Sequence, residues 1–116
     1  MLPQEAVKVV RSVVGLLVAG AYEDLATLTE ERRLTAPMMA EAVRRHGAAL
    51  ITPPEAAFDV LEATELCTGD DRECAHHVTV PLWTAREGRS TLEVQLILVE
   101  VMVGVWTVEI VSLRSR

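Results

Sequence analysis

Two cysteines and two histidines gather within one short stretch of the chain: Cys67, Cys74, His76 and His77. Thiolates and imidazoles are ligands that zinc prefers, and a zinc site needs several of them converging on one point. In a strand, side chains alternate between two faces, so Cys74 and His76 share one face while His77 points to the other. A regular strand therefore cannot supply all four ligands, and we predict no metal site.

The two cysteines flank a six-residue loop and could stand opposite each other across a hairpin. The favoured interpretation is two ordinary reduced thiols, as in cytoplasmic proteins generally. A cross-strand disulfide is the second interpretation, and it would stabilise the fold by roughly 2–3 kcal/mol on the chain-entropy model. Metal ligation ranks third.

Acid–base catalysis would need a histidine or carboxylate inside the fold, with its pKa tuned by an apolar wall. His76 is the one such residue on the expected inner sheet face, and Tyr22, Asp59 or Glu62 could join it. The simpler interpretation is that His76 ends a strand and that Tyr22 packs its ring with the hydroxyl at the surface. We predict no catalytic residues, and keep His76, Tyr22 and Asp59 as the candidates should the protein be an enzyme.

The remaining polar motifs have ordinary structural explanations. The serines stand in no nucleophile elbow, and Gly88 and Gly104 fall where hairpin turns need glycine rather than in a phosphate-binding loop. Arg44-Arg45-His46 could grip an acidic partner, but cations are also favourable at the end of a helix. We predict no cofactor.

The composition excludes some classes of function. Half of the 116 residues are hydrophobic but only 3% are aromatic, and the net charge is −6. Nucleic acid binding needs clustered cations, so we predict no nucleic-acid partner. The longest uncharged run, Ser12 to Tyr22, is too short to span a bilayer and lacks the features of an export signal, so we expect a cytoplasmic protein without a membrane partner.

Helical periodicity occupies the first half of the chain. Val7, Val10, Val14 and Leu17 recur at helical spacing and predict a helix over 3–19, with Gly20 as its end. A second helix is predicted over 22–28. A third begins after Thr35 as N-cap and ends at His46, before Gly47. The prolines of 52–54 then predict an extended connector.

Strand periodicity follows, after a turn and a strand predicted at about 60–67. Over 76–83, 91–98 and 105–111, a mainly apolar even-numbered set alternates with an odd-numbered set that mixes polar and apolar residues. Three-residue loops are predicted at 86–88 and 101–103, because an odd number of loop residues keeps the even-numbered positions of all three strands on the same face of the sheet. The resulting pairs are Leu82–Leu92, Val80–Val94, Val78–Leu96, Leu98–Trp106 and Leu96–Val108. We predict a single α+β domain over 1–116: three N-terminal helices packed on a curled antiparallel meander sheet of about four strands.

The outer face of this sheet carries more apolar surface than folding requires. Apolar patches of this kind commonly mark interfaces. We predict a homodimer or a protein partner on this face. The predicted interface residues are Trp83, Pro81, Ile97, Val99, Val105, Val111 and Leu113.

Helices followed by a curled sheet resemble the nuclear-transport-factor-2-like (cystatin-like α+β cone) superfamily, in which N-terminal helices close over a strongly bent sheet. The resemblance covers most of the chain and rests on element order; the strand pair usual between the helices is not visible, which implies a reduced version. The segment over 82–90 also resembles a stretch in small uncharacterised bacterial proteins. This superfamily contains isomerases, dehydratases, binding modules and immunity proteins, so the fold alone does not assign a function.

Our hypothesis is therefore a non-enzymatic binding or accessory domain of unknown ligand that self-associates through its sheet, with an immunity-type protein as one form of it. The alternative is a small cofactor-independent isomerase or hydratase with a site in the cone around His76.

Overall fold

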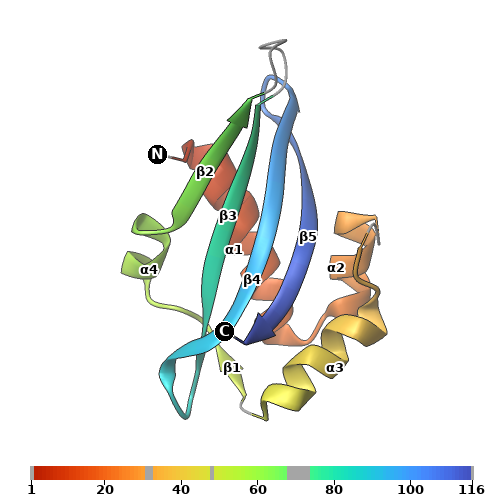
Figure 1. Ribbon diagram of the computed structural model, residues 1–116, viewed down its shortest axis with the longest axis vertical. Coiled ribbons are helices and arrows are strands. Elements are labelled where there is room, and N and C mark those ends of the chain that lie inside the picture. The colour runs from red at the N-terminus through yellow and green to blue at the C-terminus, as the bar shows by residue number, and fades with distance from the viewer. Residues whose placement is uncertain (1, 31–32, 48, 68–73, 116) are drawn as a thin grey trace.

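The computed structural model describes residues 2–30, 33–47, 49–67 and 74–115. Helices come first and an open antiparallel sheet follows, which confirms the predicted α+β class (Figure 1). The helices are α1 (Gln4–Ala19), α2 (Tyr22–Thr29), α3 (Ala36–His46) and the short α4 (Glu55–Asp59). The strands are β1 (Leu50–Ile51), β2 (Glu62–Cys67), β3 (Cys74–Thr84), β4 (Gly88–Met102) and β5 (Val105–Ser115).

The ends of the helices follow from local sequence. Pro3 is extended and precedes α1, and Gly20 ends this helix in the left-handed conformation, φ 72°, where its N–H meets the carbonyls of Leu16 and Leu17. The side chain of Thr35 caps α3 by accepting from the N–H of Met38. None of the helices in the described part of the chain combines the length and apolar character needed to cross a bilayer.

Strand order in the sheet is β1-β3-β4-β5, and β2 pairs with β3 on the same edge as β1. The sheet thus has five strands rather than about four. β1 pairs only with the last residues of β3, and β2 with its first six. The prolines at 53 and 54 separate β1 from α4, so the edge strand is interrupted where the connector was predicted.

The core lies between α1 and the inner sheet face. In Figure 1, α1 runs behind the sheet, while α2 and α3 lie beside β5. Even-numbered residues of β3 and β4 point inward, as predicted. The buried residues include Val10, Val13, Val14 and Leu17 of α1, Leu25 of α2, Met39 of α3, and Val78, Val80, Leu82, Leu92, Val94, Leu96 and Leu98 of the sheet.

The predicted register holds at the centre of β3 and β4 but not at the hairpins. Val78–Leu96 and Val80–Val94 are paired as predicted. Leu82 does not pair with Leu92, because the register shifts between Pro81 and Trp83 and the turn lies one residue earlier, over 85–87. Gly88 nevertheless has the left-handed conformation predicted for it, with φ 70°.

The β4–β5 hairpin is two residues out of the predicted register. Leu98 pairs with Val108 rather than Trp106, and Leu96 with Ile110 rather than Val108. The reason is a turn at Val103–Gly104, with Gly104 at φ 78°, and an irregularity between Glu100 and Met102. A shift of two residues keeps the same faces inward, so the alternation alone could not reveal it.

A second irregularity changes the face of one predicted interface residue. The pair Gln95–Ser112 is followed by Leu96–Ile110, so β5 contains one extra residue, a β-bulge at Val111. Beyond the bulge the alternation is reversed. Leu113 pairs with Val94 and is only 7% exposed, in the core. The prediction that Leu113 lies on the outer face is therefore wrong.

Candidate functional site

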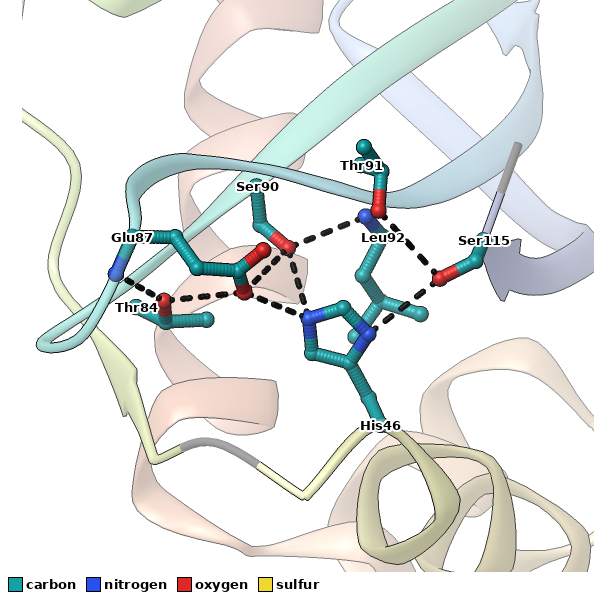
Figure 2. Close-up of polar contacts among 7 residues, drawn as sticks. All are labelled: His46, Thr84, Glu87, Ser90, Thr91, Leu92 and Ser115. Atoms are coloured by element: carbon teal, nitrogen blue, oxygen red, sulfur yellow. Dashed lines mark hydrogen bonds and ion pairs between the residues drawn. The ribbon is translucent and has the colours of Figure 1, made fainter.

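A polar cluster around His46 joins three segments that lie far apart in the sequence (Figure 2). His46 is the last residue of α3, and its side chain is 12% exposed. Its Nε2 lies 2.6 Å from Glu87 Oε1 in the β3–β4 turn and 2.8 Å from Ser90 Oγ in β4. Its Nδ1 lies 3.2 Å from Ser115 Oγ at the end of β5. The ring thus connects α3 with both the hairpin and the C-terminal strand.

The carboxylate of Glu87 is held on several sides. Besides facing His46, Oε1 accepts hydrogen bonds from Ser90 Oγ at 3.1 Å and from Thr84 Oγ1 at 3.2 Å. The backbone N–H of Glu87 donates to Thr84 Oγ1 at 3.0 Å, which fixes the turn. The hydrogen bond from His46, followed by those from Ser90 and Thr84, holds the pKa of Glu87 below its ordinary value, against the opposing effect of desolvation.

The cluster contains the groups of an acid–base relay, since an imidazole lies between a carboxylate and the exposed hydroxyl of Ser115. However, Glu87 and Ser90 share the Nε2 side of the ring, and the N–H of Leu92 donates to Ser90 Oγ at 3.0 Å. These contacts tie side chains to strand backbone. We therefore assign the cluster a positioning role, in which it fixes the end of α3 against the sheet.

Sequence reasoning did not find this cluster. The sequence pattern predicts a cationic helix end at Arg44-Arg45-His46, and it shows no nucleophile elbow around the serines. One signal was available. Thr84 and Ser90 occupy even-numbered positions, in line with the apolar inner-face set, and both are buried. Polar residues at inward positions need hydrogen-bond partners, and the turn between them supplies Glu87.

The structure does not bring the three candidate catalytic residues together. His76 lies near Trp106, with ring centroids 5.8 Å apart, and Trp106 Nε1 donates to Glu5 Oε2 at 3.2 Å. Tyr22 lines a hollow between α2 and α3. Asp59 ends α4 and lines a different hollow, beside Arg11 of α1. His76, Tyr22 and Asp59 therefore lie in three different parts of the fold and do not form a common site.

The positions of the two cysteines agree with the hairpin considered from the sequence. Cys67 and Cys74 are opposite one another in the β2–β3 register. Their intervening loop, 68–73, lies outside the described residues, as do the side chains of both cysteines. Over the ranges that the structure describes, no group of three or more His, Cys, Asp or Glu side chains is arranged to hold a metal ion.

The predicted interface residues lie in three places on the sheet and not in one patch. Pro81 and Trp83 are half-buried near the β3–β4 hairpin. Ile97 and Val99 are half-buried and approach the β4–β5 hairpin, where Val105 is exposed. Val111 is half-buried at the bulge.

Four exposed apolar side chains gather at the β4–β5 hairpin end, here called the apolar tip: Val101, Met102, Val103 and Val105. These side chains are 44%, 67%, 99% and 48% exposed, respectively. Leu66 of β2, which is exposed, lies in a different row, since it pairs with Ala75, which pairs with Val99. This row borders the tip, which begins two residues beyond Val99 along β4.

Fold and site together define a small α+β domain in which a histidine–carboxylate cluster fixes a helix to an open antiparallel sheet. The chain belongs to the family described as a domain of unknown function, DUF7668, which it matches over residues 14–115. No curated protein and no solved structure matches it significantly.

Proposed function

We propose that this protein is a non-enzymatic binding domain that forms a homodimer through the apolar tip of its sheet. The observation that carries the proposal is the exposure of four consecutive or near-consecutive apolar side chains at one hairpin. Exposed apolar area that could be buried forfeits roughly 25 cal/mol per Å². Single exposed apolar residues are ordinary, whereas a contiguous group commonly marks an interface.

The uncharged side chains of the tip are compatible with a second copy as the occupant. None of the four tip residues is charged, and the neighbouring Glu100 turns back to accept a hydrogen bond from Gly104 N at 3.1 Å. The tip side chains themselves therefore bring no like charges together in a dimer, although Glu100 stays charged beside them and each copy has a net charge of −6. In a two-fold dimer the same patch is buried on both subunits, with Ile97 and Val99 at its margin.

The wider setting of the proposal is a cytoplasmic bacterial protein, in which an immunity-type or accessory role suits a domain that binds rather than catalyses. Helices preceding a bent antiparallel sheet support the resemblance to the nuclear-transport-factor-2-like superfamily.

Light scattering on the purified protein tests the dimer. At micromolar concentrations the wild type should have about twice the chain mass of 12.7 kDa. Val103→Glu should return it to the monomer, because a charge would be desolvated at the interface. The fold should be unchanged by circular dichroism, since the Val103 side chain is 99% exposed.

Val60→Glu is the matched control, because Val60 is also highly exposed but lies between α4 and β2. This variant should remain dimeric. A wild type that stays monomeric over the whole concentration range, or a dimer that survives Val103→Glu, would contradict the proposal. The first result would leave a heterologous partner as the reason for the tip.

A further inference from the structure

The interruption of the edge strand creates a cleft on the side of β3. β1 pairs with Trp83 and Thr84, and β2 ends its pairing at Thr79, so the stretch 80–82 has no described strand partner on this edge. Pro81 has no N–H to offer an edge partner, which suits a gap in the pairing. The chain leaves the sheet over this gap and forms α4, whose Phe58 is buried.

This cleft has a volume of about 110 Å³. About 10–15 Å³ of space for the centre of a water-sized sphere is enough to hold one water molecule. The cleft therefore has room for a small side chain. Most of its walls are apolar. The lining includes Phe58, Val60, Leu61, Pro81 and Trp83, with Glu62, Glu93 and Arg89 as its charged members.

The carboxylates of Glu62 and Glu93 outnumber the guanidinium of Arg89 in the lining of the cleft. Glu62 is exposed beside it, at the start of β2. The nearest cation of α1, Arg11, is already engaged, because it forms a two-pronged ion pair with Glu55, with bonds of 2.8 and 2.5 Å. Its guanidinium also lies 4.6 Å from the centre of the Phe58 ring. Arg11 therefore packs against α4, with its charge paired to Glu55.

We propose that this cleft docks a short extended segment of a basic partner protein. In this arrangement a proline or aliphatic side chain fills the cleft against Trp83 and Pro81, and an adjacent Arg or Lys pairs with Glu62. Aromatic-lined grooves beside acidic residues suit segments of this kind, because the extended chain is already ordered before binding.

Charge complementarity selects the basic partner over a second copy. Each copy carries a net charge of −6, so a copy approaching this acidic edge is repelled over distances within the Debye length. A basic segment is attracted and steered to the same edge. The cleft also lies along β3, whereas the apolar tip lies beyond the far end of β4, so one surface can be occupied without the other.

A peptide titration followed at Trp83 tests the docking. The probe is a short synthetic peptide that alternates leucine, proline and arginine, and its counterpart replaces each arginine with glutamate. The indole N–H signals of both tryptophans are followed by NMR in monomeric Val103→Glu protein. The arginine peptide should move the Trp83 signal saturably while leaving that of Trp106, which donates to Glu5, nearly unchanged.

Two charge reversals make the experiment specific. Glu62→Lys should weaken binding about ten-fold, because a rim carboxylate is replaced by a repelling cation. Glu23→Lys on α2 changes the net charge equally and should weaken binding by no more than about two-fold. No saturable Trp83 shift, an equal response to the glutamate peptide, or equal weakening by both reversals would overturn the proposal. Because the titration uses the monomeric variant, its outcome is independent of whether the tip forms a dimer.

Discussion

Leu17→Ala should lower the free energy of unfolding by roughly 2–5 kcal/mol, the range for removing a large buried aliphatic side chain and leaving a cavity. Leu17 lies in the last turn of α1 and is 1% exposed, within the core that α1 forms with the sheet. Stability in a domain of this size is commonly only 5–15 kcal/mol in total. One such truncation therefore removes a large part of it.

Urea denaturation followed by circular dichroism measures this change, provided that the slope of the transition stays constant. Leu28→Ala is the matched control, since it makes the same chemical change in a helix at a side chain that is 44% exposed. Its effect should stay within about 0.5 kcal/mol, as for most surface substitutions. A loss below about 1 kcal/mol for Leu17→Ala would mean that α1 does not cover the sheet as described.

The face of the sheet that meets the helices was predictable because the burial signal has a period of two. Val78, Val80, Leu96 and Leu98 follow this period without interruption, so their inward orientation needs only local sequence. The ends of α1 and α3 were predictable for a similar reason, since Gly20 and Thr35 act within one helical turn.

The bulges were not predictable from the same signal. A shift of two residues at Val103–Gly104 preserves the alternation, and the extra residue at Val111 reverses it only for the last strand residues. Val111 and Leu113 are both apolar, so either could be assigned to the core by hydrophobicity alone. The outcome is decided by which of them fits against Val94 and the helices, which is a property of tertiary packing.

The candidate site was hidden for a different reason. His46 is 41 residues away from Glu87 along the chain and 69 residues away from Ser115. A short sequence motif cannot reveal residues that are so far apart along the chain. It forms because α3 ends beside the β3–β4 turn and the end of β5, and this arrangement depends on the whole fold (Figure 2).

His46→Ala should lower the free energy of unfolding, because it removes a ring that is only 12% exposed and takes one hydrogen-bond partner from the buried Ser90 hydroxyl. The substitution removes the contacts of both ring nitrogens, to Glu87 and Ser90 on one side and to Ser115 on the other. Glu87→Gln should also destabilise, and the effects of the two substitutions should not add, since they remove the same contact. Strict additivity in a urea-denaturation cycle would show that the pair is not coupled.

The contact between His46 and Glu87 should depend on pH, because the Glu87 carboxylate can be protonated. The pKa of Glu87 in the folded protein lies below its ordinary value of 4.5, chiefly because of the hydrogen bond from His46. A carboxylate whose pKa is lowered by folding binds fewer protons in the folded state, so its contribution to stability is complete above the unfolded pKa and is lost as the pH falls through the folded one. The wild type should therefore be more stable than Glu87→Gln at pH values above 4.5, and this difference should shrink as the pH is lowered below that value. Taking the difference between the two proteins cancels the other acidic groups with lowered pKa values, Glu41 and Glu55. A difference that stays constant down to the acid unfolding of both proteins would mean that Glu87 is not held by His46 in solution.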